Sequence, residues 1–198
     1  MASVANLCNQ GLILKNGNIA LNGNIEDAIR QYQISSQSAG AELDNYKRKG
    51  TGTCRINKIN IVNENGIQSN MQRLGDKMMV EVTLINFARK QLDKIRIIIG
   101  VYNPNDEGYL RFDSMTSGEL IKIAEDGCKI TCKIEEHLNI KPDQYTMNIA
   151  IFNGDELVDY VSGVGKFFIE NFDYYGSGQS VQSPELSKVF YRHSWITS

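Results

Sequence analysis

The sequence lacks any long apolar run, and no window approaches the roughly 18 consecutive apolar residues of a membrane-spanning helix. Its N-terminus also lacks the charged region, apolar stretch and cleavage site of a secretion signal. These absences argue against a chain that crosses or leaves through a membrane. We therefore expect a soluble, cytoplasmic protein.

Positive charge is not in excess either. The chain carries 21 Lys and Arg residues against 23 Asp and Glu residues, a net charge of -2. Proteins that bind nucleic acid usually present a basic excess to the phosphates. Nucleic acid is therefore not an expected partner.

Cysteine is scarce and its spacing is uninformative. The four cysteines match neither a small disulfide scaffold nor paired CxxC metal motifs. Cys128 and Cys132 would share one face of a strand and His137 follows them, but a zinc site would still need a fourth ligand. We expect reduced thiols, no metal and no cofactor.

The common catalytic motifs are missing as well. There is no G-x-x-x-x-G-K-[ST], and "GVGKFF" at 163–168 has neither its spacing nor its hydroxyl. Two histidines without G-x-S-x-G give serine chemistry little to use. Glycoside hydrolysis needs two facing carboxylates, whereas the neighbours in Glu135-Glu136 and in Asp155-Glu156 would point to opposite faces of a strand. We expect no enzymatic activity in this chain.

The first residues carry a hairpin signal followed by a helix signal. Apolar runs at 12–15 and 18–21 surround Asn16-Gly17, a favoured two-residue turn. Asn24 is placed to cap a helix, and Asp27 falls at its third position. The apolar positions of that helix follow helical spacing at Ile25, Ala28, Ile29 and Tyr32. Residues 35–52 are polar and small with no sustained period, which predicts a linker.

After the linker, the hydrophobic period changes from 3.6 to 2. Eight to ten short runs separated by turn residues predict an antiparallel β-sandwich of roughly 145 residues. The run at 53–62 alternates raggedly, which is typical of a bulge. The run at 78–86 alternates more cleanly, and the run at 95–103 places Ile97, Ile99 and Val101 on one face. Residues 156–162 and 166–170 are expected to form two further strands. In "YTMNIAIFN" we assign one stripe to the core and place Asn148 and Phe152 on the opposite stripe. That core stripe comprises Tyr145, Met147, Ile149 and Ile151.

These segments resemble a known family when taken in order. The stretch "VANLCNQGLILKNGNIALNGNIEDAIRQY" is similar to the last segment of an ABC-transporter nucleotide-binding domain. "GTGTCRINKINI", "LNIKPDQYTMNIAIF", "YYGSGQ" and "RHSW" resemble successive motifs of the C-terminal extension of Wzt-type ATPases. The resemblance implies three parts: an ATPase remnant at 1–34, the linker at 35–52 and a carbohydrate-binding domain at 53–198.

The resemblance also implies a function. Wzt-type ATPases energise export of O-antigen polysaccharides, and the extension is a non-catalytic immunoglobulin-like β-sandwich that recognises the glycan. It further implies a homodimer with exchanged terminal strands and a membrane-embedded permease as partner of the missing ATPase domain. The full-length protein would then lie at the inner face of the bacterial inner membrane.

The residues themselves offer a sugar site. Sugars are bound by aromatic faces and by planar polar side chains that hydrogen-bond hydroxyls in fixed directions. Arg111 and Asp113 share a face and are positioned to form a charge-assisted pair. The candidate carbohydrate-binding residues are Tyr102, Asn103, Arg111, Asp113, Asn148 and Phe152. The plainer alternative is a surface ion pair with ordinary exposed aromatics.

The closing segment "KVFYRHSWI" predicts one more strand. Val189, Tyr191, His193 and Trp195 would share one of its faces, and the long Gly- and Ser-containing connection before it would let it reach another subunit. We assign these four residues to a dimer interface. Two alternative functions remain open at this point: a purely structural dimerisation module, and a glycan-trimming enzyme.

Overall fold

A computed structural model describes residues 8–15, 17–25, 27–28, 43 and 46–197. The chain divides into two compact units, Met1–Ala41 and Glu42–Ser198. We describe each unit by itself.

The first unit contains the predicted hairpin. Strands β1 (Gln10–Lys15) and β2 (Asn18–Asn24) pair antiparallel, with Gly17 in the turn at φ 80°. A helix begins directly after β2, and its predicted cap is present: the Asp27 N–H donates to Asn24 Oδ1 over 2.7 Å, and Asn24 Nδ2 donates to Asp27 Oδ2 over 2.8 Å. Ala28 is buried, as its position in the helical pattern predicts. Ile29 and Tyr32 lie outside the described residues.

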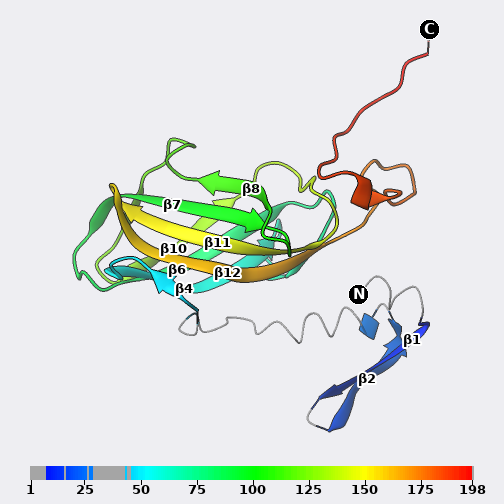
Figure 1. Cartoon of the computed structure of the whole chain (residues 1–198), viewed down its shortest axis with the longest axis horizontal. Helices are drawn as coiled ribbons and strands as arrows, with labels where there is room; N and C mark the ends of the chain where they lie inside the picture. The colour runs from blue at the N-terminus through cyan, green and yellow to red at the C-terminus, as the bar shows by residue number, and fades with distance from the viewer. Residues whose placement is uncertain (1–7, 16, 26, 29–42, 44–45, 198) are drawn as a thin grey trace. The chain divides into compact units, whose positions relative to one another are not determined.

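The second unit is the predicted β-sandwich (Figure 1). Its smaller sheet has the strand order β10-β6-β4, and its larger sheet has the order β3-β12-β11-β7-β8, with β5 pairing β12 and β9 pairing β7. All pairs are antiparallel except β5 with β12, which is parallel. The strands of the smaller sheet are β4 (Cys54–Asn63), β6 (Met78–Asn86) and β10 (Gly127–Lys133). Those of the larger sheet are β3 (Arg48–Lys49), β5 (Met71–Arg73), β7 (Leu92–Tyr102), β8 (Gly108–Asp113), β9 (Ile121–Ile123), β11 (Gln144–Asn153) and β12 (Glu156–Glu170).

The core lies between the two sheets and follows the period-2 pattern. The predicted stripe of β11 is confirmed, because all four of its members are fully buried. The Tyr145 ring lies between Tyr109 and Phe167, with centroid distances of 5.4 and 5.6 Å, and its hydroxyl donates to the Lys141 carbonyl over 2.8 Å. The predicted irregularity in β4 is also confirmed, as a register shift between Ile56 and Lys58.

A buried ion pair of the larger sheet is hydrogen-bonded to a strand of the smaller sheet. Arg48 on β3 contacts Asp159 on β12 over 2.6 Å, and the Asp159 side chain is only 2% exposed. The Ile56 N–H on β4 donates to the same Asp159 oxygen over 2.8 Å, while Arg48 donates to the Ile56 carbonyl over 2.7 Å. The three strands are therefore held by one closed polar network in an otherwise apolar interior.

Three segments differ from the sequence-based expectation. Residues 156–162 and 166–170, expected as two strands, form the single strand β12, which passes through Gly163 and Gly165 at φ 70° and 57°. Arg48 and Lys49, expected in the linker, form β3. The closing segment forms no further strand within the described chain beyond a bridge between Ile140 and Val189.

No helix among the described residues is long and apolar enough to cross a membrane.

Candidate functional site

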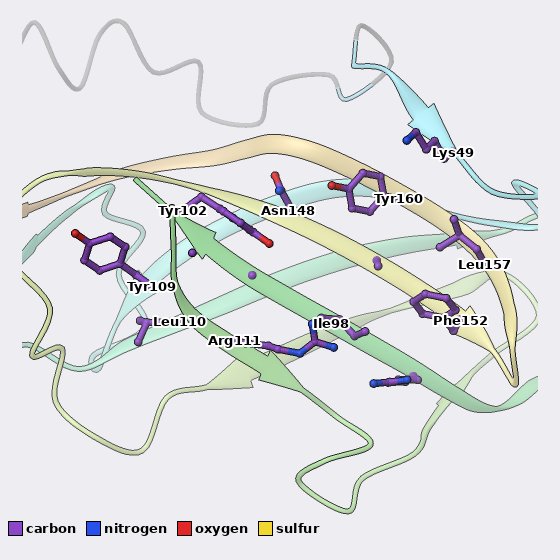
Figure 2. A pocket seen from close by; sticks show the side chains of 14 residues that line it. Lys49, Ile98, Tyr102, Tyr109, Leu110, Arg111, Asn148, Phe152, Leu157 and Tyr160 are labelled. Carbon is purple, nitrogen blue, oxygen red and sulfur yellow. The ribbon is translucent and has the colours of Figure 1, made fainter. Parts of the chain in front are cut away.

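A hollow of about 810 Å³ lies on the outer face of the larger sheet, the face turned away from the core (Figure 2). We call it the sheet groove. Its lining comes from β3, β7, β8, β11 and β12, and its volume falls in the range of roughly 300–1,000 Å³ that is usual for ligand pockets. The lining residues are Lys49, Arg96, Ile98, Gly100, Tyr102, Gly108, Tyr109, Leu110, Arg111, Asn148, Ala150, Phe152, Leu157 and Tyr160.

Small residues in the middle of the groove leave its floor close to the backbone. Gly100 on β7 lies opposite Asn148 on β11, and Ile98 lies opposite Ala150. Tyr160 on β12 is in turn paired with Ala150. Because Gly100 and Ala150 carry little or no side chain, larger side chains surround a floor that is close to the backbone. This arrangement creates the hollow.

The Tyr102 ring is held over two glycines. A Cβ added at Gly100 would lie 2.7 Å from Tyr102 Cε2 and 3.2 Å from its hydroxyl oxygen. A Cβ added at Gly108, on the neighbouring strand β8, would lie 3.6 Å from the other ring edge at Cε1. The ring can rest against the sheet in this way because Gly100 has no side chain. It thereby offers an aromatic surface at one end of the groove.

A charged network forms another wall. Arg96 Nε and Nη2 donate to the two Asp113 oxygens over 2.8 and 2.6 Å, a bidentate pair between β7 and β8. Arg111 Nη2 donates to the same carboxylate over 3.1 Å, so the predicted pair of Arg111 and Asp113 is present. The hydrogen bonds from Arg96 are the main reason why the pKa of Asp113 lies well below its ordinary value. Asp113 therefore stays ionised and fixes both guanidinium groups.

Two further contacts position polar and aromatic side chains. The Arg96 guanidinium carbon lies 5.9 Å from the centroid of the Phe152 ring, within cation–π range. Asn148 Oδ1 accepts a hydrogen bond from the Gly163 N–H over 2.9 Å, which orients its amide. The Asn148 NH₂ group makes no hydrogen bond to the described residues, so it remains able to donate to a ligand.

Four of the six predicted site residues line this one groove: Tyr102, Arg111, Asn148 and Phe152. Asp113 is not part of the lining but holds the arginines from a buried position, with a side chain only 4% exposed. Asn103 does not line the groove. It is buried in the turn after β7, where its Oδ1 accepts N–H bonds from Asn105 and Glu107.

Among the charged and aromatic residues of the groove, sequence reasoning missed four: Lys49, Arg96, Tyr109 and Tyr160. Arg96 stands on the non-core stripe of β7 with Ile98, Gly100 and Tyr102, so the alternation of that strand contained the signal. Tyr160 stands between the buried Asp159 and Val161 on β12. Lys49 gave no signal, because its strand has only two residues.

None of the described thiols and histidines lines the sheet groove. Cys54 is buried, and loss of hydration raises the pKa of its thiol to about 12. Burial also raises the pKa of both Cys128 and Cys132. His137 Nδ1 lies 2.7 Å from the Gly75 carbonyl oxygen. Within the described part of the chain, no group of three or more His, Cys, Asp or Glu side chains could hold a metal ion.

The residues assigned to a dimer interface lie in the exposed closing segment (Figure 1). Trp195 is 90% exposed, and Tyr191 is 71% exposed. The His193 ring lies between Tyr175 and Trp195 in edge-on contacts of 5.3 and 5.8 Å. Val189 forms the bridge to Ile140. Their role in a dimer remains a prediction.

Comparison with known proteins identifies a family. The family model described as the Wzt C-terminal domain matches residues 45–179, more than half of the chain. A solved structure described as the C-terminal domain of Wzt is similar in fold, with a TM-score of 0.61 and 10% identity, over 82% of this chain and 93% of that chain. A β-glucuronidase of glycoside hydrolase family 2 aligns with a TM-score of 0.37 and 15% identity, over 52% of this chain and 10% of that chain, too weakly to carry an argument. No curated protein matches.

The matched residues 45–179 include every strand that contributes to the sheet groove. The solved structure supports the same all-β architecture independently of sequence identity. The chain therefore belongs to the Wzt C-terminal domain family, which is associated with O-antigen ABC transporters.

Proposed function

We propose that the sheet groove binds a polysaccharide without cleaving it. The observation that carries this proposal is the meeting of three aromatic side chains, Tyr102, Phe152 and Tyr160, with Arg111 and Asn148 around one low floor (Figure 2). Pyranose rings present an apolar face and directional hydroxyl groups. An aromatic surface beside fixed polar groups complements both features.

The groove fits binding better than hydrolysis. Canonical glycosidases place two carboxylic acids on either side of the scissile bond, roughly 5 to 10 Å apart. The residues that line the groove include no Asp and no Glu. The nearby Asp113 is ion-paired to two arginines, and its lowered pKa makes it a poor proton donor. Recognition of a glycan, by contrast, needs Asp113 only in its ionised form, paired with its two arginines.

The biological ligand in this proposal is the O-antigen glycan that the transporter exports, and the domain confers specificity for it. Membership of the Wzt C-terminal domain family supports this assignment. We further propose that residues 1–34 are the end of an ATPase domain, through which the protein would meet a membrane-embedded permease. The hairpin supports this, because it exposes the apolar side chains of Leu12, Leu14 and Ile19, which a larger domain would cover.

Calorimetric titration with the matching glycan tests the proposal. We expect weak but saturable binding, because an open polar site gains little beyond its ordering costs. Tyr102→Ala and Phe152→Ala should each weaken binding several-fold to about ten-fold, since an aromatic contact contributes about 0.5–1.5 kcal/mol. Phe87→Ala is the control, because Phe87 is 53% exposed and lies outside the groove. Absence of binding at millimolar glycan would refute the proposal.

A second candidate function is dimerisation of the transporter subunit through the closing segment. The exposure of Trp195 and Ile196, 90% and 92%, favours it, because bare apolar side chains mark interaction surfaces. Deleting residues 185–198 and measuring the mass in solution separates the two roles. A monomer that still binds glycan would assign dimerisation to the segment and recognition to the groove. An unchanged dimer would show that strand exchange is not its cause.

A further inference from the structure

The charge of the sheet groove narrows its ligand beyond a polysaccharide in general. Lys49, Arg96 and Arg111 are the charged residues of the lining, and all three are cationic. Among the described residues, Asp113 is the carboxylate that forms ion pairs with Arg96 and Arg111. The groove therefore keeps a local positive excess in a chain whose net charge is -2. This opposite sign concentrates attraction for anions at the groove.

The two arginines differ in how many N–H donors they have left to bind a ligand. The Arg96 side chain donates from Nε and Nη2 to Asp113 and is only 31% exposed. It therefore serves mainly to fix the charged wall of the groove. Arg111 is 62% exposed and makes one contact, from Nη2 to Asp113 over 3.1 Å. Most of its five N–H donors therefore make no hydrogen bond to the described residues. Arg111 is thus the group best placed to bind an oxyanion in bidentate fashion.

Lys49 places a second positive charge across the groove. Lys49 lies on β3, at one edge of the larger sheet, where it is the register partner of Tyr160. Arg111 lies on β8, at the opposite edge of the same sheet. Five neighbouring strands at the usual spacing put these edges roughly 19 Å apart. Lys49 makes no ion pair within the described chain. The groove therefore carries a cation at each side, with aromatic and small residues between them.

We propose that the sheet groove selects an acidic glycan, in which a carboxylate or phosphate group is bound by Arg111. The inference rests on the proposed function and specifies its substrate class. A neutral sugar would offer no anionic partner to the exposed Arg111 donors or to Lys49. An acidic sugar forms charge-assisted hydrogen bonds with them, which are stronger than neutral ones. Carboxylate and phosphate share this oxyanion chemistry.

The first experiment is a microarray of bacterial polysaccharides, both acidic and neutral, probed with the full chain. Each glycan that binds is then compared in solution with its neutral counterpart: a uronic acid glycan with its carboxyl-reduced product, and a phosphorylated glycan with its phosphatase-treated product. We expect the acidic form to bind at least about ten-fold more tightly, the scale of one charged hydrogen bond. The two pairs distinguish carboxylate from phosphate recognition.

Variants locate the preference. Arg111→Gln should remove most of the acidic preference, and Arg111→Lys should restore part of it, because lysine keeps the charge without the planar fork. Lys58→Gln removes the same charge from an exposed position on β4, outside the groove, and should change nothing. Higher salt should weaken binding of the acidic form more than that of the neutral form.

Each result has a defined reading. Loss of the preference in Arg111→Gln alone supports the inference. Equal binding of acidic and neutral forms, or a preference that survives Arg111→Gln, overturns the acidic selectivity and leaves glycan binding intact. If no glycan on the array binds, the proposed function itself fails.

Discussion

At the scale of single residues, Asp113 determines how the arginines of the groove are presented. Its buried carboxylate accepts hydrogen bonds from Arg96 and Arg111, and the Met115 N–H also donates to it. These bonds favour the ionised form and lower the pKa of Asp113. Since its folded-state pKa lies below the unfolded value, Asp113 stabilises the fold above about pH 4 and loses that contribution as the pH falls further.

Replacing Asp113 should therefore have a pH-dependent cost. We expect Asp113→Asn to lower the free energy of unfolding by about 1.5–3 kcal/mol at pH 7, because hydrogen bonds to charged groups are lost. The difference from the unsubstituted chain should shrink below about pH 4. Urea unfolding across this pH range measures it. Asp126→Asn, which removes an exposed pair with Arg89, is the control, and an equal effect there would contradict the role of burial.

Gly100 tests whether the Tyr102 ring must lie where it does. In Gly100→Ala, the new Cβ would meet Tyr102 Cε2 at 2.7 Å, so the ring must move. We expect glycan binding to fall about as far as in Tyr102→Ala, by several-fold to about ten-fold. Gly108→Ala is the matched control, since its Cβ would make an ordinary 3.6 Å contact with the same ring. Similar titrations for the two variants would contradict this account.

At the scale of strands, hydrophobic alternation predicted most elements and the core. The clean stripes of β6, β7 and β11 were readable because one face of each is packed against the other sheet. The short strands β3 and β5 were not readable, because their pairing with β12 depends on tertiary contacts rather than on local pattern. The strand β12 was predicted as two strands, because Gly163 and Gly165 resemble a turn in the sequence. In the structure both glycines lie within one strand.

The network around Asp159 should be essential to how β3, β4 and β12 stay joined. Asp159→Asn leaves Arg48, which is 17% exposed, without its counter-charge. Breaking a buried ion pair by removing one partner costs about 3–5 kcal/mol, and we expect a loss of that size in unfolding free energy. Chemical denaturation measures it. A loss below about 1 kcal/mol, the usual value for an exposed pair, would contradict the structural role given to this network.

At the scale of the whole molecule, the sequence predicted several residues of the candidate site but not where in the fold they would meet. Alternation put Asn148 and Phe152 opposite the core stripe, and the groove contains both. It could not show that β3, β12, β11, β7 and β8 would align in one sheet, because strand order depends on long-range pairing. Arg96 was missed although the alternation of its strand contained the signal, and Lys49 was missed because its strand has only two residues. Asn103 was included because a turn residue resembles a strand end.

The central claim is that one face of the larger sheet, rather than the closing segment or a loop, binds the glycan. A crystal structure of the chain with a bound oligosaccharide tests it most directly. We predict a sugar ring against Tyr102 or Phe152, with its polar groups within hydrogen-bond distance of Arg111 and Asn148. An oligosaccharide bound to the smaller sheet, or to the aromatic side chains around Trp195, would contradict the account.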